Sequence, residues 1–275
     1  MASAIEILSW TLASGRRPQA FLDAWWVAAA LGSVGGERRV AMARRLLALS
    51  PHYLLGHRPW RAGDAALAEA FAAMQASRQR IFDRVFLPDV GVGGTFLDYG
   101  CGPGCLSVAA ARYAERVVGV DISSGVLACA RVLSVAPNLT YVTAPTGLDA
   151  LPDASVHAVG SLAVLQHLTT EAVDRSLRDW HRLLVPGGRV VAHVVLDSTP
   201  DWRREEDWRR DVSVTGRARY RLGLHCFARP ASWYEARLAA HGFAVVDVLP
   251  IAVRTGDVFD DVCAQHLVVA RRDHR

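Results

Sequence analysis

The sequence predicts an α/β fold in which helices cover both faces of a parallel sheet, with a helical extension in front of it. The chain has 275 residues, of which 51% are hydrophobic and 21% charged, enough apolar material for a proper core. Residues 1–90 are rich in Ala, Leu and Arg, and their apolar residues recur at helical spacing. From Thr95 onward, short apolar runs alternate with helical segments, which is typical of a helix-covered parallel sheet.

The N-terminal extension is expected to hold three or four helices. Apolar residues three or four positions apart, such as Leu67, Phe71 and Met74, mark one of them. The GVGG at 91–94 then separates this part from the next, so the predicted domains are 1–90 and 91–275. Glycine and proline punctuate the extension at 32–36, 50–51 and 59–63.

The second part is expected to alternate strands and helices. Predicted strands lie at 95–100, 116–121 and 139–143, within 155–165, and at 189–196, 243–249 and 264–270. Predicted helices lie at 106–114, 125–135, 170–184 and 232–240. The run Pro186-Gly187-Gly188 is predicted to be the turn between helix 170–184 and strand 189–196, and 197–230 reads as a polar, arginine-dense insertion.

The basic residues exclude several kinds of chemistry. All 31 Lys and Arg residues are arginine, and the sequence contains no lysine. Schiff-base and pyridoxal-phosphate enzymes need a lysine amine. A P-loop and a protein kinase each need a lysine beside the phosphates. None of these functions fits the chain.

Cysteine content and hydropathy predict a cytoplasmic protein without membrane contact. The five cysteines are odd in number and scattered, which favours reduced thiols over a disulfide framework. The start MASAIEILSW lacks a basic region before its apolar residues, so no secretory leader is expected. The longest apolar run, AWWVAAAL, is far shorter than the ~20 residues that cross a bilayer.

The most informative segment is a glycine-rich turn between a predicted strand and a predicted helix. Gly100, Gly102 and Gly104 follow the strand in G-x-G-x-G spacing, and glycines let backbone amides approach a ligand at the carboxyl edge of a sheet. Cys105 stands where a dinucleotide-binding turn needs its third glycine. Asp98 precedes the turn, where a carboxylate would repel a pyrophosphate but suit a ligand with an ammonium group. The alternative is an ordinary strand-to-helix turn.

A second acid, Asp121, ends the next predicted strand. This is the position from which a carboxylate accepts the two ribose hydroxyls of a nucleoside. The alternative is a capping or Asx-turn residue before Ser123. Together Asp98 and Asp121 fit a nucleoside that carries an amino-acid tail and no phosphate.

Five segments, taken in order, resemble the motifs of class I S-adenosylmethionine-dependent methyltransferases. LDYGCGPG resembles the first motif of this family, and VVGVDIS its acidic strand-end motif. LDALPDASVHAVGSLAVLQHL resembles the loop and fourth strand of its L-P-x-x-S-x-D-x-V…H-L branch. LLVPGGRVV and HGFAVV resemble the turns into its fifth and sixth strands. The resemblance covers about residues 90–275 and implies a Rossmann-like αβα sandwich with seven strands, the last antiparallel.

The resemblance also implies a set of residues that bind S-adenosylmethionine. Asp98 would face the amino group of the methionine moiety, Asp121 would hold the ribose, and Ile122 would pack on the adenine. Gly147 and Leu148 would cover the adenine edge, although Thr146-Gly147 stands where the family usually has an acid. The other implied cofactor contacts are Gly100, Cys101, Gly102, Gly104, Ser123, Ser161, Leu162 and Arg78, the last toward the cofactor carboxylate unless it is a surface arginine.

Two histidines are candidates for the general base that a protonated nucleophile would need. His167 follows the predicted fourth strand at the carboxyl edge of the sheet, and its alternative role is to hold a loop or cap a helix. His225 is the second candidate, whereas His193, inside the fifth strand, is predicted to be a satisfied core histidine. No metal site is predicted, because no cluster of ligands has the required spacing.

Segment 201–221, DWRREEDWRRDVSVTGRARYR, holds seven arginines, five acids and three aromatic residues. Three interpretations are open: a clamp for an anionic or aromatic acceptor, an RNA-binding surface, or a solvated helix with internal ion pairs such as Arg203 or Arg204 with Asp207. The net charge of the segment, only +2, argues against a strong phosphate track.

The resulting hypothesis is methyl transfer from S-adenosylmethionine to a small-molecule acceptor, in the manner of natural-product biosynthesis, with S-adenosylhomocysteine as product. The N-terminal helices are expected to cover the acceptor site, and the protein to be a monomer or a homodimer without a nucleic-acid partner. Two alternatives remain open: an RNA methyltransferase, and a catalytically silent cofactor-binding scaffold or regulator.

Overall fold

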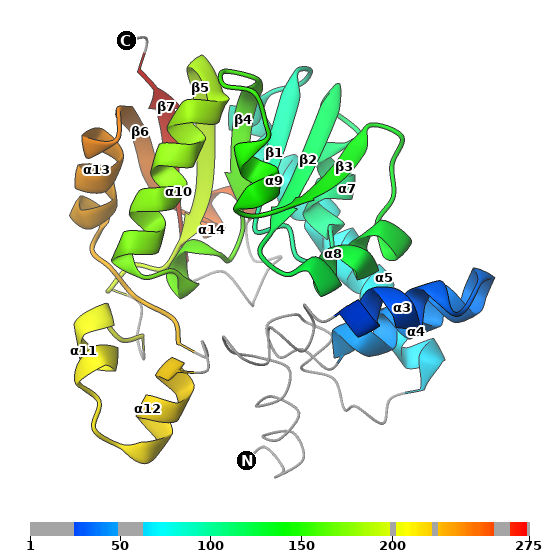
Figure 1. The fold of residues 1–275 in the computed structure, drawn as a ribbon. Helices are drawn as coiled ribbons and strands as arrows, with labels where there is room; N and C mark the ends of the chain where they lie inside the picture. The colour runs from blue at the N-terminus through cyan, green and yellow to red at the C-terminus, as the bar shows by residue number, and fades with distance from the viewer. Residues whose placement is uncertain (1–24, 49–62, 199–201, 222–224, 256–264, 274–275) are drawn as a thin grey trace.

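The structure is a computed structural model, and it describes residues 25–48, 63–198, 202–221, 225–255 and 265–273 (Figure 1). The predicted alternation of strands and helices is present from residue 95 onward. No helix in these ranges is long and apolar enough to cross a membrane. The predicted division into domains at residue 90 stays a prediction.

Seven strands form one sheet in the order β3-β2-β1-β4-β5-β7-β6. Neighbouring strands are parallel from β3 to β5, whereas β7 is antiparallel to both β5 and β6. This arrangement confirms the predicted Rossmann-like αβα class. The strands are β1 Thr95–Tyr99, β2 Arg116–Asp121, β3 Leu139–Thr143, β4 Val156–Ser161, β5 Leu184–Val194, β6 Phe243–Pro250 and β7 His266–Arg272.

The helices divide into an N-terminal group and those that connect the strands. The N-terminal group is α3 Trp25–Gly32, α4 Gly36–Ala48, α5 Asp64–Ile81, a π-helix Phe82–Phe86 and α6 Leu87–Val90. The connecting helices are α7 Cys105–Ala110, α8 Ser124–Leu133, α9 Thr146–Asp149, a 3-10 turn Leu165–His167, α10 Thr170–Leu183, α11 Glu205–Arg210, α12 Val214–Arg221, α13 Ala231–Ala240 and α14 Ala252–Thr255.

The Pro-Gly-Gly run is not the predicted turn between a helix and a strand. Strand β5 begins at Leu184, directly after α10 ends, and Leu184 pairs with Val156 of β4. The next paired residue of β5 is Arg189, opposite Ala158, so the residues between them form a bulge inside the strand. Gly187 permits it with a φ of 76°, in the left-handed region that glycine adopts readily.

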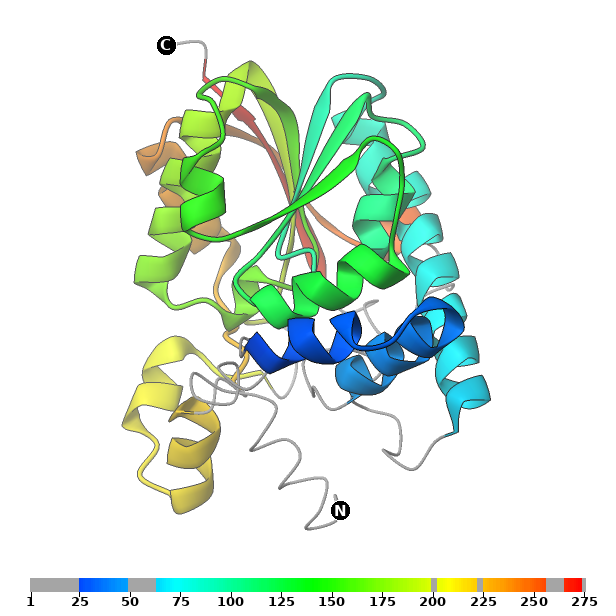
Figure 2. The ribbon, with the colours of Figure 1, turned by 45° about the vertical axis from the view of Figure 1, so that its right-hand side comes forward.

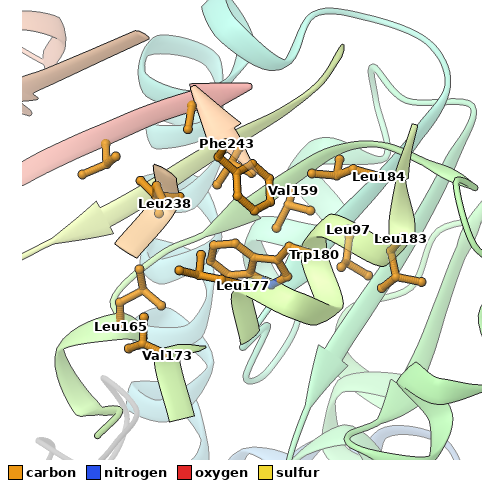
Figure 3. Close-up of a cluster of buried hydrophobic side chains, with 14 of the residues drawn as sticks. Leu97, Val159, Leu165, Val173, Leu177, Trp180, Leu183, Leu184, Leu238 and Phe243 are labelled. Carbon is orange, nitrogen blue, oxygen red and sulfur yellow. The ribbon is translucent and has the colours of Figure 1, made fainter. Parts of the chain in front are cut away.

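One face of the sheet is covered by α10 and α13. Trp180 of α10 is fully buried at the centre of this layer and meets the Tyr99 ring edge-on at 5.2 Å between centroids. Figure 3 shows this cluster. Its labelled members are Leu97, Val159, Leu165, Val173, Leu177, Trp180, Leu183, Leu184, Leu238 and Phe243.

The opposite face is covered by the π-helix, α7 and α14, with Phe82, Leu106 and Ile251 among the buried residues. Helices α3, α4 and α5 form a further cluster with α8 through Val126 and Cys129. Figures 1 and 2 show α3 lying along α8. The described part of the N-terminal extension is therefore packed onto the helix that follows β2, beside one end of the glycine turn.

Candidate active site

The glycine turn connects β1 to α7 at the carboxyl edge of the sheet. Gly100, Gly102 and Gly104 have φ values of 76°, 52° and 80°, a region that glycine enters without steric cost. Two of them also allow close packing, because a Cβ at Gly100 would overlap the Val164 side chain and a Cβ at Gly104 would overlap the Tyr141 hydroxyl. Conformation favours glycine at all three positions, and space requires it at Gly100 and Gly104 as well.

Asp98 lies beneath this turn and is buried, with 1% of its surface exposed. Ser107 Oγ donates a hydrogen bond of 2.5 Å to its carboxylate. Burial raises the pKa of Asp98 to about 7, with a smaller contribution from the charge of Asp121. A cationic group brought to this place would relieve both effects, so the site favours a positively charged ligand.

Asp121 lies at the end of β2, within reach of both the glycine turn and α8. Its Oδ2 accepts a hydrogen bond of 2.9 Å from the Gly102 amide, and its Oδ1 accepts one of 2.9 Å from the Ser123 amide. Ser123 in turn caps α8, with its hydroxyl accepting from Val126 N. Ile122 is 61% exposed, so its apolar side chain lies at the surface next to Asp121 in the chain. A flat aromatic ring such as adenine would need an apolar surface of this kind.

The two cysteines of the turn are buried and unsuited to nucleophilic chemistry. Burial raises the pKa of the Cys105 thiol to about 12, and it raises that of Cys101 well above its ordinary value. The Cys101 amide donates to Val120 O at 2.9 Å. The Cys101 amide is thus bonded within the protein, and the implied contact of Cys101 with the cofactor stays a prediction.

The residues expected at the adenine edge form the short helix α9. Leu148 is 1% exposed, and its side chain belongs to the main core cluster, while its carbonyl accepts a hydrogen bond of 3.0 Å from Arg182. A Cβ at Gly147 would lie 2.9 Å from Val142 Cβ, so α9 packs closely on β3. The Leu148 side chain therefore lies in the core, and the contact of this segment with a ligand stays a prediction.

The loop after β4 brings further predicted residues to the end of β1. Ser161 Oγ donates to Tyr99 O at 3.2 Å, and Leu162 packs on the cluster beneath α7. Arg78 is half-buried near the end of α5, and its charge opposes the rise in the pKa of Cys105. Arg78 therefore lies close to the glycine turn, where the cofactor carboxylate is expected.

The structure brings the two candidate bases together. His167 Nδ1 is 3.0 Å from the carbonyl oxygen of His225, and His225 Nε2 is 3.2 Å from that of His167. Because a carbonyl only accepts, each of these nitrogens carries its hydrogen, which leaves the lone pair on His167 Nε2 and on His225 Nδ1. Burial lowers the pKa of both rings, which keeps them neutral near pH 7.

His193 is buried as predicted, but it is satisfied at only one nitrogen. Its Nδ1 accepts a hydrogen bond of 3.0 Å from the Ala163 amide. Its Nε2 has no hydrogen-bond partner among the described residues. Burial lowers the pKa of His193 to about 3, so the ring is neutral. The side chain of Gln265 nevertheless lies close enough to act on the pKa of this ring, so the prediction of a core histidine is confirmed for its burial and for Nδ1.

The arginines of 201–221 mostly serve ion pairs and ring contacts within the protein. Arg203 pairs with Asp211 at 2.7 Å and lies over the Trp208 ring, and Arg204 pairs with Asp197 at 2.5 Å. The expected partner Asp207 takes part in neither of these ion pairs. The contacts still favour arginines paired within the protein over a free cationic clamp.

Sequence patterns do not reveal what anchors this insertion. Glu205 and Arg229 form a buried ion pair of 2.8 Å, and Glu205 also accepts hydrogen bonds from the Thr170 amide and hydroxyl. Arg229 donates to Leu168 O at 2.7 Å. These residues are far apart in the chain, so only the fold brings them together. The arginine density was the one available signal.

A metal centre has no support in the described ranges, where no group of three or more His, Cys, Asp or Glu residues could hold an ion.

Comparison with known proteins also finds methyltransferases. A family model described as a methyltransferase domain matches residues 97–192. The N-demethylindolmycin N-methyltransferase of Streptomyces griseus is 36% identical over 108 residues, 38% of this chain and 44% of that protein. The ubiquinone biosynthesis O-methyltransferase of Pseudomonas paraeruginosa is 36% identical over 107 residues, 38% of this chain and 45% of that protein. The chain thus spans less than half the length of these relatives.

A solved structure of an S-adenosylmethionine-dependent methyltransferase from Listeria monocytogenes has a TM-score of 0.51 at 22% identity, covering 72% of this chain and 99% of that one, and it shows the shared fold. The structure thus shows an αβα domain with a glycine turn and two strand-end carboxylates. By the family match, residues 97–192 form a methyltransferase domain.

Proposed function

We propose that this protein transfers the methyl group of S-adenosylmethionine to a small-molecule acceptor and releases S-adenosylhomocysteine. The observation that carries the proposal is the pair of buried carboxylates, Asp98 and Asp121, on either side of the glycine turn. They fit a cationic nucleoside with ribose hydroxyls, and they would repel a phosphate. Ile122 offers the exposed apolar surface on which the adenine ring would pack.

The cofactor supplies an activated methyl group on a sulfonium, and the chain has to bind and orient it. Asp121 accepts from the ribose hydroxyls in place of, or beside, its two backbone donors. Asp98 stabilises the ammonium group, and Arg78 meets the carboxylate. Positioning of this kind contributes about 7–11 kcal/mol in well-aligned systems. The acceptor attacks the methyl carbon as the bond from that carbon to the sulfonium sulfur breaks, so the leaving group is S-adenosylhomocysteine.

We propose His167 as the general base where the nucleophile must lose a proton. Its Nδ1–H is committed to the His225 carbonyl, which fixes the ring and leaves the basic lone pair on Nε2. Its lowered pKa keeps the base unprotonated at neutral pH. His225 holds His167 in place through the reciprocal bond and is the second candidate through Nδ1.

The acceptor is proposed to be a small molecule rather than RNA. The internal ion pairs of Arg203, Arg204 and Arg209 leave fewer cations for a phosphate backbone. The two curated relatives described above act, by their names, on small molecules at nitrogen and at oxygen. The segment 197–230 is proposed as the acceptor side of the site because it is fastened to the loop that carries His167.

The direct test is acceptor-dependent formation of S-adenosylhomocysteine, with a panel of catechols, phenols and indole amines as acceptors. Asp121→Ala serves as the negative control, and Asp247→Ala, an exposed acid on β6, serves as the matched surface control. Turnover that appears with wild type and Asp247→Ala and disappears in Asp121→Ala supports the proposal. Equal product with and without every acceptor contradicts it.

A further inference from the structure

His193 occupies the penultimate position of β5, between two neighbouring strands. It is fully buried, and it pairs in register with Leu267 of β7. Buried apolar residues surround this layer of the sheet, including Val191 two positions earlier on the same strand. A histidine costs more to bury here than an aliphatic residue does, because both of its ring nitrogens are polar and need partners.

One ring nitrogen, Nδ1, has a hydrogen-bond partner. His193 Nδ1 accepts the amide hydrogen of Ala163 at 3.0 Å, so the ring carries its own hydrogen on Nε2. Burial keeps the ring neutral, and the acceptor on Nδ1 therefore persists throughout the neutral pH range. The bond connects β5 to the loop that follows β4.

Ala163 needs such a restraint. Its φ is 60°, in the left-handed region that costs a non-glycine residue conformational energy. Residues hold this conformation where the surrounding structure imposes it, and such places are concentrated at functional sites. The His193 bond is a restraint that acts on the Ala163 amide itself.

The residue after Ala163 reaches the glycine turn. The Val164 side chain packs so closely on Gly100 that a Cβ at Gly100 would overlap it. The conformation of Ala163 therefore decides where Val164 meets the glycine turn at the carboxyl edge of the sheet. Ser161, two residues before Ala163, bonds to Tyr99 at the start of the same turn.

We propose that His193 is a positioning residue for the cofactor site: by accepting from the Ala163 amide, it fixes the left-handed residue that seats Val164 on Gly100. This role rests on the proposed function, since it concerns the binding of S-adenosylmethionine and its product. It acts through Ala163 and Val164, without contact between His193 and the reacting atoms. A residue that served packing alone would be replaceable by leucine.

Two isosteric variants separate the ring nitrogens. The Oδ1 of His193→Asn can take the place of Nδ1 and accept from Ala163, whereas His193→Gln places an amide near Nε2 and lacks that acceptor. His193→Leu removes both. The control Val191→Ala opens space on the same strand without touching Ala163, so it reports the effect of lower stability alone.

The measurements are the dissociation constant of S-adenosylhomocysteine by calorimetry and hydrogen exchange of the Ala163 amide. His193→Asn and Val191→Ala are expected to bind nearly as wild type does, and His193→Gln and His193→Leu about tenfold more weakly, with faster exchange at Ala163. Equal binding by all variants, or equal losses in Asn and Leu, would overturn the proposal. Absence of binding by the wild type would instead overturn the proposed function on which it rests.

Discussion

His167 and His225 each hydrogen-bond the backbone carbonyl of the other, at 3.0 and 3.2 Å. The pair joins the loop after β4, which approaches the glycine turn, to the insertion before α13. Each ring is fixed in one tautomer by this exchange. The base and the residue that orients it thus come from segments that are 58 positions apart in the chain.

The first prediction concerns His167→Asn. An asparagine amide can still donate to the His225 carbonyl but offers no basic nitrogen, so the fold is retained while the base is lost. For a substrate that must be deprotonated, kcat is expected to fall by about 10²–10⁴-fold with the cofactor dissociation constant unchanged. Initial-rate kinetics and calorimetry measure the two quantities. A kcat within a few-fold of wild type assigns His167 a purely conformational role.

The second prediction concerns the pH dependence of cofactor binding through Asp98. Its pKa of about 7 in the folded chain lies above the ordinary 3.8, so the folded chain binds more protons between these values. Its contribution to the free energy of unfolding is therefore present at low pH and is lost as the pH rises through 7. A cationic ligand needs the ionised carboxylate of Asp98, so ligand binding competes with protonation of that carboxylate.

Affinity for S-adenosylhomocysteine is accordingly expected to rise with pH below 7, by up to about tenfold per unit, and to level off above it. Asp98→Asn should bind more weakly and lose the slope. Calorimetry across this range gives the profile. The same slope in Asp98→Asn would assign the titration to another group.

The third prediction uses two glycines that share a backbone conformation but differ in the space available for a Cβ atom. Gly100→Ala meets the Val164 side chain, whereas Gly93→Ala, at a φ of 83°, meets nothing nearer than Glu115 Oε1 at 3.8 Å. Both carry about 1–2 kcal/mol of backbone strain, and Gly100→Ala adds about 1–3 kcal/mol of overpacking. Chemical denaturation measures the difference. Adding Val164→Ala should recover part of the loss in Gly100→Ala but none in Gly93→Ala.

The fourth prediction concerns the buried ion pair of Glu205 and Arg229. Glu205→Ala leaves a buried guanidinium without its partner and is expected to destabilise the fold by about 3–5 kcal/mol. Arg204→Ala removes an exposed side chain from a pair with the half-buried Asp197 and should cost about 1 kcal/mol or less. Urea unfolding distinguishes them, and similar losses in the two variants would refute the distinction.

The sequence predicts the sheet and the cofactor edge well because both depend on local patterns. Apolar runs mark the strands, and the G-x-G-x-G spacing with Asp98 and Asp121 marks the turn. Each of these signals lies within one strand and the residues that follow it. The predicted site residues around the turn therefore come together in the structure.

Local sequence patterns do not predict contacts between segments that are distant in the chain. The bulge in β5 depends on the register with β4. Neither the hydrogen bonds between His167 and His225 nor the Glu205–Arg229 ion pair has a characteristic spacing in the sequence. His193 shows the same limit: its place in a strand predicts burial, but only the fold shows that its Nδ1 accepts from Ala163. Side-chain partners follow from tertiary packing.

The central claim, that Asp121 and the glycine turn bind S-adenosylmethionine, is tested most directly by calorimetric titration of that compound into wild type, Asp121→Ala and the surface control Asp247→Ala. The account predicts micromolar binding by wild type and Asp247→Ala. It predicts a loss of at least about tenfold in Asp121→Ala, because a charged acceptor of hydrogen bonds is removed. Undiminished affinity in Asp121→Ala would contradict the account.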